Sequence, residues 1–385
     1  MTMPPGTPQH DRLRTLDGFR ALAILAVIGF HYFARWAPPQ APHALYPYGA
    51  LGASWFPFRY GYLGVELFFI ISGFVISMTL FRSRSFGNFV RKRFARLFPT
   101  MLLCSILSFV IVSSLPQHAL QPRWRDFLPS LTFTDPLLWS PLFGVPFHAM
   151  DGSYWSLFVE VKFYFWIGLL YFGVGSRRFF AAVALGIAAL VAAMGTMLAW
   201  GLSHTWALNF VFALDYLPWF VAGVGFYALY CNHRDRLGWL LLLEAVLAVP
   251  VLHVRHLSDS VVPLLAMAVC YVLFLLMLLR PRSLAWLSAR PLAAVGMASY
   301  SLYLLHQDIG VAVLASIREA VGPTAPWTAI ALPLGLVLLL TASSLAIYRY
   351  WEAPAKDFLL HWRWPGRAAA KAEAVAVKGR VPSPD

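Results

Sequence analysis

Long apolar runs recur along most of this chain and are separated by short polar or basic segments. A run of about 20 apolar residues can cross a bilayer as an α-helix, because the helix rises ~1.5 Å per residue across ~30 Å of hydrocarbon. The pattern predicts an all-α, polytopic bundle of about ten membrane spans. We place them near residues 18–36, 60–81, 98–115, 154–173, 179–200, 207–230, 237–253, 260–280, 293–316 and 327–349.

The two ends and two internal segments lack such runs. Residues 1–12 and 361–385 have no apolar face, which predicts disordered cytoplasmic tails on either side of one membrane domain at 13–360. Segments 37–59 and 116–153 are rich in proline, aromatic and small polar residues. They are long for simple connections, so we expect outer loops that cover a functional site.

Composition and charge agree with a membrane protein. Hydrophobic residues make up 59% of the chain and charged residues 12%, and the mean hydropathy is +0.65. With both termini cytoplasmic, most of the 30 Lys and Arg residues fall on the cytoplasmic side, as basic residues usually do. The net charge of +13 then favours anionic membrane lipids or a phosphorylated cytosolic ligand. Neither a nucleic-acid module nor a metal-ligand spacing is visible.

Ionisable residues inside apolar runs are the strongest functional signal, because each costs ~2.5–3.5 kcal/mol near the bilayer centre. Arg20 and His31 are predicted to lie on one face of the first helix, about three turns apart. A guanidinium at the cytoplasmic mouth can hold a phosphate, and a deeper imidazole can act as a general base. The alternative for His31 is a packing histidine bonded to a neighbouring carbonyl.

Two carboxylates are candidates to orient His31, as the third member of a catalytic triad does. Glu66 is predicted in the outer half of the second span, at a depth similar to that of His31, and Glu160 about two turns into the fourth span. Each has the alternative of a purely structural role. Small residues of the second span are predicted to allow close helix approach: Gly64, Ser72 and Gly73.

The basic segment before the third span has two interpretations. Arg93 and Arg96 are three residues apart and share a helical face, which favours a phosphate-binding patch together with Arg20. The alternative is ordinary cytoplasmic charge. Weaker candidates for substrate contact lie in the fourth and ninth spans: Tyr154, Ser156, Tyr300 and His306.

Seven segments together resemble the acyltransferase-3 family over residues ~13 to ~360. They are Arg20 to His31, GYLGVELFFIISGF, Arg93 to Arg96 followed by Pro99, WSLFVEVKFY, LPWFVAGVGFY, SYSLYLLH and WEAP. The resemblance implies a multi-pass O-acyltransferase of the bacterial inner membrane. Such enzymes move an acyl group, commonly acetyl, from cytosolic acyl-CoA to hydroxyls of cell-surface or exported carbohydrates, and some relatives acylate macrolides.

The resemblance also implies roles for individual residues. His31 becomes the catalytic histidine, as general base or acyl relay, and Arg20, Arg93 and Arg96 become donor-binding residues. Glu66 stands where the family often has Asp, a change that should alter reach more than chemistry. Acyl-CoA would be a co-substrate rather than a permanently bound cofactor, and the acceptor a carbohydrate or glycolipid.

Three further expectations concern how this protein acts. The sequence shows no SGNH-type domain, which some relatives carry to complete the transfer outside the membrane. A separate periplasmic transferase is therefore expected as a possible partner. A transporter of a glycan or small molecule would also hold buried Glu and His residues. A non-catalytic member of a polysaccharide assembly complex is the third alternative, and loss of His31 should leave it functional.

Overall fold

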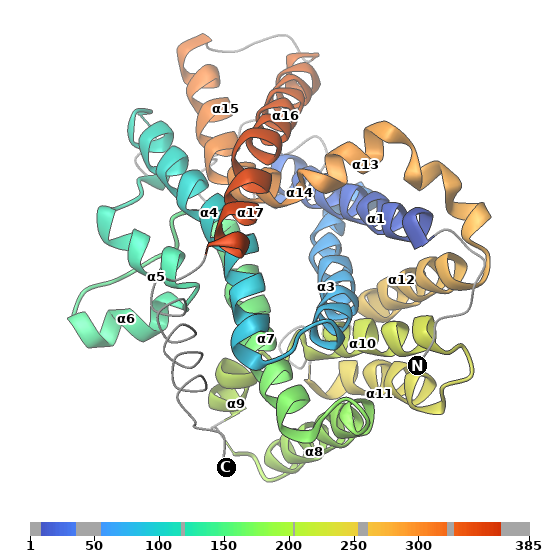
Figure 1. The fold of residues 1–385 in the computed structure, drawn as a ribbon. Coiled ribbons are helices and arrows are strands. Elements are labelled where there is room, and N and C mark those ends of the chain that lie inside the picture. Colours follow the sequence, from blue (N-terminus) through green and yellow to red (C-terminus); the bar gives the residue numbers. More distant parts are fainter. Residues whose placement is uncertain are drawn as a thin grey trace, which may run out of the picture.

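The computed structural model describes residues 9–35, 55–116, 120–202, 205–252, 261–321 and 327–362, and all regular elements in these ranges are helical. The longer helices are α1 (Gln9–Phe30), α3 (Gly64–Phe81), α4 (Phe86–Ser113), α7 (Trp155–Val174), α8 (Phe179–Ala199), α10 (Leu217–Cys231), α11 (Arg236–Leu252), α12 (Val261–Leu279) and α16 (Thr328–Ile347). The shorter ones are α2 (Phe56–Arg59), α5 (Phe127–Thr132), α6 (Pro136–Phe143), α9 (Thr205–Phe212), α13 (Arg290–Met297), α14 (Ser299–Leu305), α15 (Asp308–Val321) and α17 (Ala353–His361). They form one bundle (Figure 1).

The described helices confirm a multi-pass membrane protein. Seven helical stretches of the described chain are long and apolar enough to cross a membrane, and α9 with α10, bent by 41°, gives an eighth where the pair is counted as one span. Of the remaining two expected spans, one is a shorter helix and the other is interrupted. Helix α11 has 17 residues, and the expected span at 293–316 is divided among α13, α14 and α15. The expected count of ten therefore stays a prediction.

The interruption of the expected span at 293–316 creates the geometry of the site. Helix α14 ends at Leu305, His306 follows as its C-cap, and α15 begins at Asp308. The backbone N–H of Asp308 donates a hydrogen bond to the side chain of Asp151 instead of continuing the helix. The apolar sequence gives no sign of this break, because a carboxylate from a distant segment caps the new helix.

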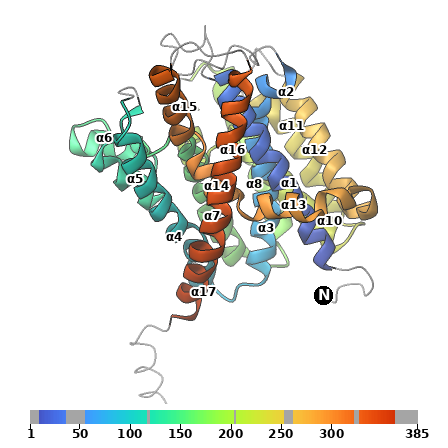
Figure 2. The ribbon, with the colours of Figure 1, turned by 90° about the horizontal axis from the view of Figure 1, so that it is seen from above.

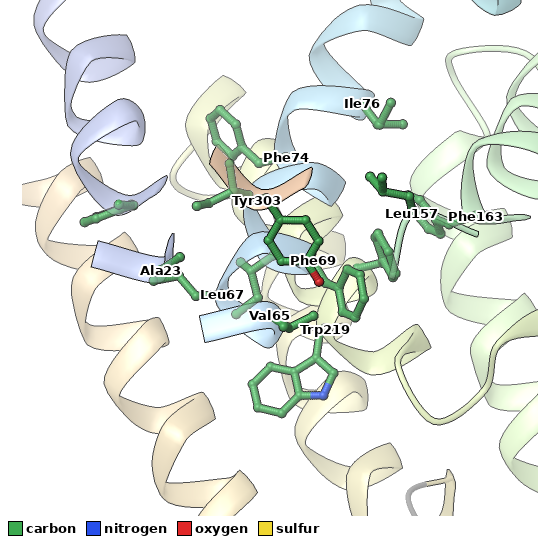
Figure 3. Packing of buried hydrophobic residues seen from close by; sticks show 14 of the residues in the cluster. Ala23, Val65, Leu67, Phe69, Phe74, Ile76, Leu157, Phe163, Trp219 and Tyr303 are labelled. Carbon is green, nitrogen blue, oxygen red and sulfur yellow. The ribbon is translucent and has the colours of Figure 1, made fainter. Parts of the chain in front are cut away.

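Close contact between α3 and α10 depends on glycine. A Cβ atom on Gly73 would lie 2.1 Å from the carbonyl oxygen of Phe220, and one on Gly223 would lie 2.1 Å from that of Ile70. Gly64 approaches α1 in the same way. The prediction that Gly64 and Gly73 allow close helix approach is confirmed. Around this contact, Figure 3 shows buried side chains from α1, α3, α7, α10 and α14 in one core.

The start of α1 and the whole of α17 lie at the same end of the bundle, and α13 crosses the long helices (Figure 2). Of the predicted N-terminal tail, residues 9–12 are already part of α1. Residues 1–8 and 363–385 lie outside the described part, as do 37–54 of the first predicted loop. Segment 116–153 contains the helices α5 and α6, which project beside α4 (Figure 2).

Candidate active site

His31 lies where α1 changes its winding. The α-helix ends at Phe30, and the chain continues from His31 to Arg35 as a π-helical turn. Such wide turns are uncommon and often occur at functional sites. The next residue, Tyr32, is fully buried and donates a hydrogen bond of 2.6 Å from its hydroxyl to the carbonyl of His306. The hydroxyl occupies space that only Gly310 leaves free, since a Cβ there would lie 1.8 Å from it.

The side-chain hydrogen-bond partner of His31 is a second histidine, and the His31 ring also has a backbone hydrogen bond with Val27, one turn earlier on α1. Nδ1 of His31 is 3.0 Å from Nε2 of His306, and Nδ1 of His306 is 2.7 Å from the carbonyl oxygen of Tyr303. Because a carbonyl can only accept, we assign the proton of neutral His306 to Nδ1, and Nε2 then accepts from Nδ1–H of His31. The free lone pair of His31 is therefore on Nε2, which is the arrangement a general base requires.

The two predicted carboxylate partners do not bond to His31 in the described part of the chain. Gly64 packs against Ala23, which lies eight residues or ~12 Å before His31 along α1. Glu66 follows Gly64 on a helix that runs in the opposite direction, so it lies still further from the level of His31. It is 5% exposed, and its Oε2 atom has no hydrogen-bond partner among the described residues. The expectation that Glu66 shares the depth of His31 is not met.

Glu160 belongs to a separate polar cluster. It accepts hydrogen bonds from the hydroxyls of Ser72 on α3 and Tyr164 on its own helix. Ser72 therefore has a polar partner in addition to being small, which the sequence did not suggest. Tyr164 was also missed, although it follows Glu160 by four residues and so shares its helical face.

A cavity of about 720 Å³, counting its part open to solvent, brings together most of the predicted site. Its lining includes three arginines, one carboxylate and three tyrosines: Arg20, Arg93, Arg96, Glu160, Tyr164, Tyr300 and Tyr303. Arg20 forms an ion pair of 2.7 Å with Asp17. The guanidinium of Arg93 donates to Thr79 and lies 5.6 Å from the ring centre of Tyr164, and its Nε has no partner in the described part. Three cations in one cavity suit a ligand with several phosphates.

Tyr303 separates this cavity from the histidine pair. Its ring lines the cavity and lies 5.4 Å, centre to centre, from the ring of His306. Its hydroxyl accepts from Ser156 at 2.8 Å and donates to the carbonyl of Ser153 at 3.0 Å. His31 itself does not line the cavity. The basic cavity and the histidine pair are thus neighbours with one aromatic ring between them.

The weaker candidates take different places. Ser156 and Tyr300 line the cavity, and the Tyr300 hydroxyl donates to the carbonyl of Leu97 at 3.0 Å. Tyr154 is fully buried outside the lining, with its hydroxyl 3.4 Å from the carbonyl of Leu304. His306 contacts His31 instead of the cavity.

The chain is similar to known acyltransferases. The acyltransferase-3 family, described as an acyltransferase domain, matches residues 13–349. The chain is 30% identical to the acyltransferase MdmB of Streptomyces mycarofaciens over 168 residues, 43% of this chain and 40% of that protein. It is 27% identical to the putative peptidoglycan O-acetyltransferase YrhL of Bacillus subtilis over 206 residues, 50% of this chain and 29% of the other.

A third relative is the O-acetyltransferase OatA of Staphylococcus aureus, 26% identical over 162 residues, which are 39% of this chain and 23% of that protein. The chain thus spans less than half the length of each of these relatives. No solved structure matches.

Proposed function

This chain belongs to the acyltransferase-3 family, and on that premise we propose that it moves an acyl group from acyl-CoA to a hydroxyl group, as a membrane O-acyltransferase. The observation that carries the proposal is the hydrogen-bonded pair of His31 and His306 directly behind the wall of a cavity with three arginines. Acyl transfer from a CoA thioester uses a base for the acceptor hydroxyl and cations for the phosphates of CoA.

In the direct mechanism, Nε2 of His31 removes the proton of the acceptor hydroxyl. The oxygen attacks the thioester carbonyl, the carbon–sulfur bond breaks, and the CoA thiolate takes the proton from the imidazolium. In the relay mechanism, Nε2 attacks the thioester carbonyl first and the carbon–sulfur bond breaks, which releases the CoA thiolate. The acceptor hydroxyl then attacks the acyl carbon, the bond from that carbon to Nε2 breaks, and the hydroxyl proton goes to the CoA thiolate. In both, Nδ1–H of His31 keeps its hydrogen bond to His306 while positive charge develops, so this bond strengthens in the transition state.

The donor site in this proposal is the basic cavity. Arg20, Arg93 and Arg96 hold the phosphates of CoA, and the thioester end extends past Tyr303 towards His31. In this proposal the bundle lies in the inner membrane of a bacterial cell, and the donor enters from the cytoplasm. The family resemblance and the bias of basic residues towards the cytoplasmic side support both points. Two of the relatives are named O-acetyltransferases, which supports acetyl as the acyl group.

The acceptor in this proposal is a hydroxyl of a cell-surface or exported carbohydrate or glycolipid. One relative is named for peptidoglycan O-acetylation, and this supports a glycan acceptor for the present chain. We also propose a separate periplasmic transferase as a partner for acceptors that do not reach the membrane.

Membranes containing the protein should be incubated with radiolabelled acetyl-CoA, followed by measurement of released CoA and of label in the carbohydrate fraction. The wild type should transfer label, and His31→Ala should not, at equal expression. His361→Ala is the control for loss of a histidine elsewhere, because this histidine is exposed at the end of α17 and does not line the cavity. Equal transfer by wild type and His31→Ala would refute the proposed role of His31.

Transport of a glycan or small molecule is the alternative that the same experiment tests. The buried carboxyl of Glu66, with one oxygen lacking a hydrogen-bond partner in the described part, is the observation that favours it. A transporter would release no CoA from any acyl-CoA, with any acceptor. Glu66→Gln would then abolish substrate uptake while leaving the protein folded.

A further inference from the structure

The segment leading into α7 is bound tightly to the break between α14 and α15. Oδ2 of Asp151 accepts the backbone N–H of Asp308 at 2.9 Å, and Oδ2 of Asp308 accepts that of Gly152 at 3.2 Å. The two carboxylates thus cap each other's segments. Asp151 is fully buried and Asp308 is 9% exposed. A side chain at Gly152 would displace the end of Gln307, because a Cβ there would lie 2.2 Å from Nε2 of Gln307.

The same segment fixes the carbonyl on which the His306 tautomer depends. Tyr303 donates from its hydroxyl to the carbonyl of Ser153, and its own carbonyl accepts Nδ1–H of His306. The Ser153 hydroxyl lies 2.7 Å from Oδ1 of Asp151 and 3.1 Å from the Tyr303 carbonyl. Since a hydroxyl has one proton, the shorter distance favours the bond to Asp151. The Tyr303 carbonyl is then left to His306.

We propose that Asp151 and Asp308 are positioning residues that act through His306, and so hold His31 in its base tautomer. The inference rests on the proposed function in so far as it concerns acyl transfer. Neither carboxylate touches His31 or lines the basic cavity. Their effect reaches the reaction through the position of the α14–α15 break.

The chemistry of the carboxylate explains why aspartate is needed at these positions. A carboxylate offers two acceptor oxygens, whereas the carboxamide of Asn offers one and presents an NH₂ group to the other donor. Oδ1 of Asp151 already accepts the backbone N–H of Ser153 at 2.8 Å, and Oδ2 accepts that of Asp308. Burial raises the pKa of Asp151, and the bonds that its oxygens accept from the backbone and hydroxyl of Ser153 and from the backbone of Asp308 oppose that rise by favouring the ionised form. Replacement of Asp151 by Asn conserves the shape of the side chain, but its NH₂ group then faces the backbone N–H of Ser153 or of Asp308.

Asp126 provides a matched control for the substitution. It is also buried, at 2% exposure, and its two oxygens also accept two backbone N–H groups, those of His148 at 2.9 Å and Arg123 at 3.0 Å. It forms no hydrogen bond with the segment 303–308 in the described part of the chain. Asp126→Asn and Asp151→Asn therefore remove the same kind of interaction at equal burial, and only the second is connected to His306.

The experiment compares Asp151→Asn, Asp308→Asn and Asp126→Asn in the full chain by two measurements. The first is nitrogen NMR of ¹⁵N-histidine-labelled protein, with the His306 signals identified by their loss in His306→Ala. The second is kcat and KM for acetyl-CoA. The NMR measurement does not depend on activity, so it tests the positioning of His306 even if no acyl transfer is found and the proposed function fails.

We expect Asp151→Asn and Asp308→Asn to change the tautomer signals of His306 and to lower kcat about tenfold, or ~1.4 kcal/mol, with KM for acetyl-CoA unchanged. Asp126→Asn should lower thermal stability to a similar extent but leave both readouts at wild-type values. In a His306→Ala background, Asp151→Asn should cause no further loss of kcat, because the two changes act on one unit. Wild-type tautomer signals in both Asp151→Asn and Asp308→Asn would overturn the proposal, as would additive losses in the double variant.

Discussion

Replacing His306 with alanine should slow acyl transfer without weakening donor binding. His306 lies outside the arginine cavity, and its Nε2 atom is the side-chain hydrogen-bond partner of the His31 ring, beside the backbone of Val27. In the ground state this is a bond between two neutral rings. In the transition state His31 carries a positive charge, so the same bond becomes charge-assisted.

The expected size of the effect follows from this change in charge. A hydrogen bond contributes ~0.5–1.5 kcal/mol net between neutral groups and ~1.5–3 kcal/mol to a charged group. The bond therefore gains ~1–1.5 kcal/mol in the transition state, and its loss corresponds to a fall in kcat of roughly fivefold to tenfold. His306→Gln should fall between the wild type and His306→Ala. Its carboxamide oxygen can accept from Nδ1–H of His31 but does not reproduce the bond from His306 to the Tyr303 carbonyl.

The assay is the initial rate of CoA release from acetyl-CoA by purified protein in proteoliposomes, with saturating acceptor. Thermal unfolding of each variant serves as the control for folding, because His306 is fully buried. A His306→Ala protein of wild-type stability whose kcat stays within about twofold of the wild type would refute the tautomer argument. A tenfold rise in KM for acetyl-CoA at unchanged kcat would refute it as well, since the residue would then bind the donor.

Three further substitutions test other parts of the structure. Gly73→Val should prevent folding, measured as loss of the monodisperse peak in gel filtration, because the Cβ would lie 2.1 Å from the carbonyl of Phe220; normal elution would show that α3 and α10 are further apart. Gly310→Ala should displace the Tyr32 hydroxyl from its bond to the His306 carbonyl and so lower the free energy of unfolding by about 1–3 kcal/mol, measured by denaturant titration. Gly335→Ala is the control, because a Cβ there meets no atom, and it should leave the free energy of unfolding unchanged. Arg93→Lys should raise KM for acetyl-CoA roughly tenfold at unchanged kcat, because an ammonium group cannot bind a phosphate bidentately; an unchanged KM would remove Arg93 from the donor site.

The sequence was sufficient for the features that depend on local spacing. Apolar runs of membrane length predicted an all-helical membrane protein. The three-residue offset placed Arg93 and Arg96 on one face, and both line the same cavity as Arg20. The small residues Gly64 and Gly73 predicted close helix contacts. Asp151 was missed, although an Asp directly before a helical segment is a usual capping signal.

The tertiary structure decided the depth of Glu66 relative to His31 and the hydrogen-bond partner of His31. Glu66 was expected beside His31 because both lie in the outer halves of their spans, but the contact of Gly64 with Ala23 sets the relative height of α1 and α3 and keeps the two side chains apart. The partner of His31 is His306, 275 residues away in sequence, at a helix break that the apolar pattern does not reveal.

The physical reason is that hydrophobic periodicity shows which side of a helix is buried. It does not show the height at which one helix packs against another. The relative height of two helices is set by a few close contacts between them and by hydrogen bonds between distant segments, such as those of Asp151 and Asp308. The sequence alone therefore determined a membrane helix bundle with a basic face and a buried histidine. Only the packed structure decided which group pairs with that histidine, and hence which of its nitrogens is free to act as a base.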